Sequence, residues 1–201
     1  MNRLAPVHGL FGSRSLPDEA NSRGDEAVRT VSKADADELL SRDLEALIDD
    51  FTIEFTEVNL DWENPSMSEP EPMKANSYQD QLGQIIRVPQ VRSTVTIPLE
   101  GGRLLLTFWS HQGAPMMRPI EGTLTEDSLQ LTWIGDPAVE PATISRWLDE
   151  RRSEINRFLE NNNRDVSELN AGMRSRARAA IERRRTDELN RRGFVGRLSR
   201  Q

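Results

Sequence analysis

The sequence contains no cysteine, and it is poor in two other residues that catalysis often uses, with two histidines (His8 and His111) and two lysines (Lys33 and Lys74). Disulfide bonds, thiolate zinc sites and cysteine nucleophiles are therefore excluded, and a reducing compartment, the cytoplasm, is expected. A catalytic triad or a histidine metal centre would have to rest on His111, because His8 lies in a segment of tail-like composition. The sequence predicts no metal site and no cofactor, and it favours a protein that is not an enzyme.

Long apolar segments are also missing. No window approaches the roughly 20 apolar residues of a membrane-spanning helix, and residues 1–16 lack the continuous apolar stretch of a signal peptide. Apolar residues make up 36% of the chain and charged residues 29%, so a minority of segments must supply the core. We expect a soluble protein with one α+β core, flanking tails and no contact with a membrane.

The N-terminal part of the chain divides into a tail, a helix and a loop. Residues 1–31 hold turn formers and charges with few apolar residues at either structural period, which predicts a disordered or loosely docked tail. Ser32 then suits a helix N-cap, and leucines at helical spacing predict an amphipathic helix ending near Asp50. Residues 63–84 are rich in proline, serine and acidic side chains, which predicts a long acidic loop within an α+β core at residues 32–136.

Two stretches of alternating apolar residues predict the sheet. The first hairpin is expected to pair residues 91–99 with residues 104–108 across a turn at Gly101 and Gly102. The second is expected to pair residues 120–124 with residues 129–133 across Glu126 and Asp127. Sequential hairpins give an antiparallel β-meander with one buried face, and we expect the N-terminal helix to cover that face.

The C-terminal part is predicted to be helical. Residues 137–192 carry apolar residues at helical spacing, and three consecutive asparagines at 161–163 suggest a break before a second helix that starts with a capping box at Asp165 and Glu168. Two long helices are therefore expected, as a helical hairpin or an extended arm, followed by a basic tail at residues 193–201. The fold class is α+β.

Asparagines recur at a seven-residue interval within these helices, at Asn156, Asn163 and Asn170. Buried asparagines at heptad spacing can set the register of a coiled coil. Roles in a cap or a linker explain Asn163 more simply, so both interpretations stay open.

Positive charge is concentrated near the C-terminus. From Arg174 to Gln201 the chain has ten arginines against three acidic residues, a net charge of +7, and the remainder carries −14. Such asymmetry indicates a surface for an anionic partner or for the acidic part of the same chain. The candidate anionic-partner-binding residues are Arg174, Arg176, Arg178, Arg183, Arg184 and Arg185. At 3.6 residues per turn they spread around the helix, which favours pairing with acidic residues of the chain itself over phosphate contacts.

Three functions follow as hypotheses. The leading one is a non-enzymatic binding or adaptor protein that docks a protein partner, or self-associates as a homo-oligomer, through its C-terminal helices. The second is a nucleic-acid or nucleotide-binding module that uses the arginine-rich helix; it lacks base-stacking aromatic residues, since Phe194 is the one aromatic residue after Leu159. The third is a small hydrolase with its site around Ser110 and His111, in the loop between the hairpins.

Overall fold

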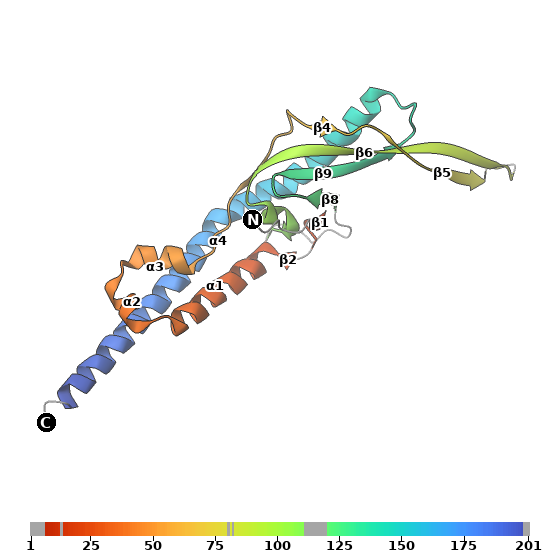
Figure 1. Ribbon diagram of the computed structural model, residues 1–201. Helices are drawn as coiled ribbons and strands as arrows, with labels where there is room; N and C mark the ends of the chain where they lie inside the picture. Colours follow the sequence, from red (N-terminus) through yellow and green to blue (C-terminus); the bar gives the residue numbers. More distant parts are fainter. Residues whose placement is uncertain (1–6, 13, 80, 82, 111–119, 199–201) are drawn as a thin grey trace. The chain divides into compact units, whose positions relative to one another are not determined.

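The computed structural model describes residues 7–12, 14–79, 81, 83–110 and 120–198. It confirms the α+β class, with an antiparallel sheet, several helices and a long C-terminal helix (Figure 1). The chain forms two compact units, each made from two separate stretches of sequence. Unit 1 comprises Met1–Arg14 and Glu57–Asn163, and unit 2 comprises Ser15–Thr56 and Arg164–Gln201. No helix in the described ranges combines the length and apolarity needed to cross a bilayer.

Unit 1 is built on an antiparallel sheet in which strands β1, β8, β9, β6 and β3 are neighbours in that order, and in which β4 and β5 also pair with β6. The bounds are β1 (Val7–Leu10), β3 (Val58–Leu60), β4 (Ser66–Met67), β5 (Glu71–Gln79), β6 (Ile85–Gly101), β8 (Ile120–Leu124) and β9 (Ser128–Gly135). Two further strands, β2 (Arg14–Ser15) and β7 (Phe108–Trp109), are two residues long. The buried face alternates along β6 at Val95, Ile97 and Leu99, as expected for a half-buried strand.

Of the two predicted hairpins, the second is confirmed and the first is wrong. β8 and β9 pair directly, with Leu124 opposite Leu129. Residues 103–107 form a 3₁₀ helix, η1 (Arg103–Thr107), in place of a strand, and β6 pairs with β9 along its buried stretch. The reason is the run of three leucines at 104–106, because one turn of helix buries Leu105 and Leu106 together while Leu104 stays 43% exposed.

The sheet is covered by the first part of helix α4 (Pro141–Leu198). Ile155, Phe158 and Leu159 of α4 are buried, and Trp62 donates an indole hydrogen bond of 2.9 Å to the Asn156 Oδ1 atom. Residues 32–50, the predicted N-terminal helix, belong to unit 2. A sequence pattern identifies an apolar face but does not say which face it meets.

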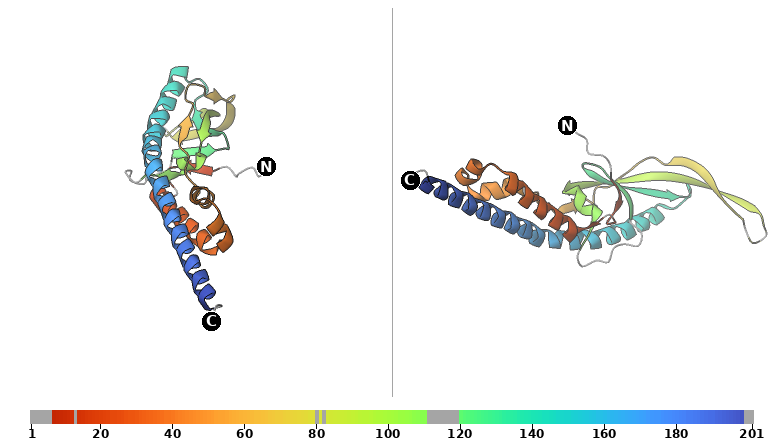
Figure 2. Two further views of the ribbon diagram at one scale, coloured as in Figure 1. Left: turned by 90° about the vertical axis from the view of Figure 1, so that its left-hand side faces the viewer. Right: turned by 90° about the horizontal axis from the view of Figure 1, so that it is seen from below.

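The predicted acidic loop at residues 63–84 is also corrected, because β4 and β5 lie within it. β5 pairs with β6 from Glu71 opposite Arg92 to Gln79 opposite Ile85, forming a two-stranded ribbon (Figures 1 and 2). Its described side chains are exposed or only partly buried on both faces, so no apolar alternation marks these strands in the sequence.

Both edges of this ribbon carry a proline. The Leu99 N–H donates to the Asp127 carbonyl, so the odd-numbered residues of β6 direct their backbone N–H and C=O groups toward β9. Pro89 is odd-numbered and lies beyond Val91, the last residue of β6 that pairs with β9. It therefore stands on the edge that β9 leaves open. Pro72 stands opposite Val91 in β5 and likewise faces away from its partner strand. Because proline has no N–H, both open edges are poor templates for an added strand.

Unit 2 begins with helix α1 (Leu16–Lys33), where the sequence predicted a tail. The Ser15 hydroxyl caps the helix by accepting from the Asp18 N–H at 3.1 Å, and Pro17 stands in the first turn. The buried stripe of α1 consists mainly of small residues: Ala20, Gly24, Ala27 and Val31. The tail assignment fails because alanine and glycine carry almost no hydrophobic signal while still giving close helix packing.

The single helix predicted at residues 32–50 is two short helices, α2 (Ala36–Ser41) and α3 (Leu44–Phe51). Ser32 lies inside α1 and is not an N-cap. Asp35 and Asp43 cap α2 and α3 instead, each accepting hydrogen bonds from backbone N–H groups of the first turn. Two capping aspartates within eight residues divide the leucine-rich stretch.

Helix α4 runs unbroken for 58 residues, so the two predicted helices are one, and residues 193–198 continue it where a tail was expected. The side chains of Asn162 and Asn163 do not break the helix, because they bond to other segments and not to the helix backbone. Asn163 in unit 1 bonds both the N–H and the carbonyl of Val58, at 3.1 and 2.8 Å. Asn170 in unit 2 bonds both backbone groups of Phe55, at 2.9 Å each. Each of these two asparagines thus satisfies both backbone groups of one residue in another segment.

A candidate partner-binding groove

In unit 2 the segment that contains α2 and α3 returns along α4 in the opposite direction. Asp37 bonds Arg192, Glu45 bonds Arg178, and Phe55 bonds Asn170, so rising residue numbers meet falling ones. Many of the acidic residues of this segment meet arginines of α4. These contacts determine which of the six candidate arginines already have a partner within unit 2.

Arg174 lies in the densest charge cluster. Its guanidinium donates to Glu54 Oε1 at 2.8 Å, to Asp49 Oδ1 at 2.7 Å and to Glu45 Oε2 at 3.2 Å. These carboxylates, Glu54 first and Asp49 next, raise the pKa of Arg174 further above its usual range. Arg178 shares the Glu45 carboxylate. Both arginines are therefore neutralised within the chain.

Arg176 and Arg185 also have partners inside unit 2. Arg185 donates to the carbonyl oxygens of Leu39, at 2.6 Å, and of Arg42. Both carbonyls lie at the C-terminal end of α2, where the helix itself supplies no N–H donor. Arg176 donates to the Asn21 Oδ1 atom at 2.7 Å and lies 3.6 Å from the Asp25 carboxylate. Four of the six candidates thus hold unit 2 together.

Arg183 and Arg184 differ from these four. In the described part of the chain, neither guanidinium has a hydrogen-bond or ion-pair partner. Both line a groove of about 460 Å³ between α1 and α4. We call it the α1/α4 groove; its lining residues are Val28, Val31, Ser32, Arg176, Ala179, Ala180, Arg183, Arg184 and Asp187.

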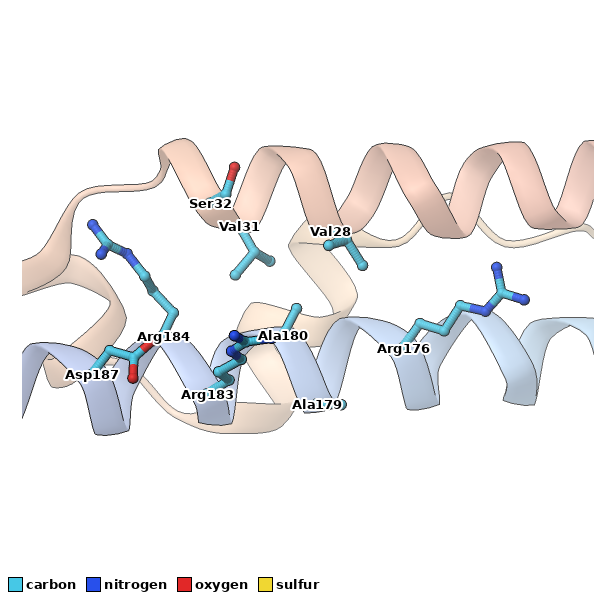
Figure 3. Close-up of a pocket in the computed structure, with 9 residues that line it drawn as sticks. All are labelled: Val28, Val31, Ser32, Arg176, Ala179, Ala180, Arg183, Arg184 and Asp187. Carbon is cyan, nitrogen blue, oxygen red and sulfur yellow. The ribbon is translucent and has the colours of Figure 1, made fainter.

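The groove has an apolar floor and charged ends. Figure 3 shows Val28 and Val31 of α1 directed toward Ala180 of α4, with Arg176 at one end and Arg184 beside Asp187 at the other. Val31 is buried, whereas Val28 stays 39% exposed. The Nε atom of Arg184 is buried and has no acceptor in the described structure. A buried donor without an acceptor costs roughly 1–3 kcal/mol.

Beyond the groove, α4 carries a second charge cluster around the buried side chain of Glu188. Its carboxylate accepts from Arg191 at 2.7 and 2.9 Å and from the Arg192 Nε atom at 2.7 Å, and Arg192 also bonds Asp37. The hydrogen bonds from Arg191, and then those from Arg192, lower the pKa of Glu188 to about 2.

This pKa predicts acid sensitivity of unit 2. As the pH falls through 4.5, the unfolded chain takes up a proton on Glu188, but the folded chain does so only near pH 2. The contribution of Glu188 to stability is therefore complete above pH 4.5 and lost by pH 2. We expect Glu188→Gln to destabilise the protein at pH 7 and to match the wild type at pH 2. Denaturant unfolding followed by circular dichroism at several pH values measures this, and a difference independent of pH would contradict it.

The remaining sequence candidates gain little from the structure. Ser110 is 1% exposed, and His111 lies outside the described residues. No group of three or more histidine, aspartate or glutamate side chains in the described part of the chain is arranged to hold a metal ion. The α1/α4 groove was not predicted as a site, because its two walls are about 150 residues apart in sequence; Arg183 and Arg184 were the available signal.

Fold and groove together define an α+β protein with an open, apolar and partly cationic helix–helix surface. No protein-family model, curated protein or solved structure matches the chain.

Proposed function

We propose that this chain is a non-enzymatic binding or adaptor protein of the cytoplasm that docks a protein partner in the α1/α4 groove. The observation that carries the proposal is the pairing pattern of the arginines. Four of them neutralise or cap neighbouring elements, whereas Arg183 and Arg184 face an apolar groove without a partner in the described structure. Apolar floors with a few placed polar groups are typical of binding sites.

The same pattern weighs against nucleic acid as the partner. A phosphate-binding surface needs several cations that are not already paired. Arg174 and Arg178, however, form ion pairs with acidic residues between Glu45 and Glu54. The groove floor contains valine and alanine and no aromatic ring on which a base could stack. Docking by strand addition along the ribbon is disfavoured by Pro72 and Pro89.

Site-specific photo-cross-linking tests the proposal. We expect p-benzoylphenylalanine in place of Val28 to give a discrete protein adduct in cells that produce the chain. The control places the same group at Ile53, which is 70% exposed in unit 2 and does not line the groove. An adduct from Val28 alone supports the proposal, and an adduct of twice the chain mass identifies a second copy as the partner. An adduct that nuclease removes, or equal labelling from both positions, would contradict it.

A further inference from the structure

The α1/α4 groove is the open side of a pair of helices. α1 and α4 run in the same direction (Figures 1 and 2). Val31 of α1 and Ile181 of α4 belong to one buried cluster with Leu39, Leu47 and Ile48 of α2 and α3. The neighbouring Val28, one turn away, remains exposed. The segment that contains α2 and α3 therefore covers one side of the pair, and among the described residues no element covers the other side.

The dimensions of the open side fit a helix. Its α4 wall extends from Arg176 to Asp187, about 16 Å at the rise of an α-helix, which is roughly three turns. Ala179 and Ala180 on this wall have small side chains, so the backbone of another helix can approach α4 closely. An amphipathic helix that lays its apolar face in such a groove is a recurrent mode of protein recognition.

The charge of the groove selects among amphipathic helices. Arg183 and Arg184 bring two positive charges that have no partner in the part of the chain that the structure describes, against one acidic lining residue, Asp187. A carboxylate beside an apolar surface complements this charge, and a charge-assisted hydrogen bond to an accessible guanidinium N–H group is stronger than a neutral one.

We infer that the groove takes an acidic amphipathic helix of a partner protein, with glutamate or aspartate side chains on Arg183 and Arg184 and aliphatic side chains against Val28, Val31 and Ala180. This inference rests on the proposed function and adds the chemistry of the partner segment. The two arginines act as the specificity-determining contacts, and the apolar floor supplies the buried area.

The test uses two synthetic 18-residue amphipathic peptides that share one leucine face and differ at the flanking positions, with glutamate in one and glutamine in the other. Fluorescence anisotropy with the full chain should show at least tenfold tighter binding of the glutamate peptide at 50 mM NaCl, and a smaller difference at 500 mM. The double substitution Arg183→Glu, Arg184→Glu should remove this preference and favour a matched lysine peptide. Because neither arginine has an internal partner, circular dichroism should show an unchanged fold.

Arg146→Glu is the control, since it makes the Arg-to-Glu exchange at one exposed position of α4 outside the groove, and it should leave the preference intact. Equal affinity for the glutamate and glutamine peptides, or the absence of binding by either, would overturn the inference. If the Val28 cross-link still forms, and survives the double substitution, the docking function holds and the acidic chemistry fails. If the chain that carries the photo-reactive group at Val28, with both arginines intact, gives no cross-link, the proposed docking function itself is wrong.

Discussion

Gly101→Ala is expected to destabilise unit 1 by about 3 kcal/mol. Gly101 has φ +97°, which a residue with a side chain rarely adopts, and a Cβ atom there would lie 1.9 Å from the carbonyl oxygen of Glu57. The obstacle is backbone, so no side-chain rotation relieves it. The substitution must therefore separate β3 from β6, where Gly101 pairs with Val58.

Tryptophan fluorescence measures this effect selectively, because all four tryptophans, at positions 62, 109, 133 and 147, belong to unit 1. The matched control is Gly172→Ala in the unit 2 part of α4, where an added Cβ atom meets nothing within 4 Å. Because unit 2 has no tryptophan, this variant is followed by far-ultraviolet circular dichroism. Removing a glycine from a helix interior should stabilise it by roughly 0.5–1 kcal/mol. The same chemical change thus has opposite signs at the two positions, and equal effects would show that the close approach of β3 and β6 is wrong.

The second large effect is expected at Asn162, which is fully buried in unit 1. Its Nδ2 atom donates to the carbonyl oxygens of Leu105 and Phe108, both at 2.8 Å, and so fixes the η1 segment against α4. Asn162→Leu removes the two hydrogen bonds that the side chain donates to these carbonyls. At roughly 0.5–1.5 kcal/mol for each hydrogen bond, we expect a loss of about 2 kcal/mol.

Asn162→Asp should be worse at neutral pH, although it hardly changes the shape of the side chain. A buried carboxylate has no donor for the two carbonyls and repels them, so the folded state should raise the pKa of the new carboxyl group. Protonation restores one donor, and stability should therefore recover partly as the pH falls. Asn161→Asp, at a half-buried neighbouring position, is the control and should have a small effect in the same fluorescence assay. A similar loss in both aspartate variants would contradict the proposed role of Asn162.

The sequence predicts well where one physical pattern dominates. Alternation across the Glu126 and Asp127 turn identified β8 and β9, because that hairpin buries one face and exposes the other. The same rule failed for β5, whose side chains are exposed on both faces and whose pairing depends on backbone hydrogen bonds. It failed for α1, where Ala20, Gly24 and Ala27 form the packing stripe.

The candidate site shows a similar division. Composition identified the arginines of α4 as a set, and their spread around the helix favoured internal pairing. It could not identify the acidic partners, because Glu45 and Arg174 are separated by well over a hundred residues. For the same reason the sequence could not show that Arg183 and Arg184 lack such partners, which is the property that distinguishes them.

Unit 2 is made from two distant stretches of sequence, so its two parts leave the ribosome at different times during translation. Leu47 and Ile48 emerge early, but Ile181, against which they pack, is translated about 130 residues later. At 5–20 residues per second this delay lasts roughly 7–26 s. During this time the first stretch exposes its apolar side chains while Glu57–Asn163 of unit 1 is translated. A nascent chain of this kind depends on chaperones or on its own charge to stay free of aggregation until α4 arrives.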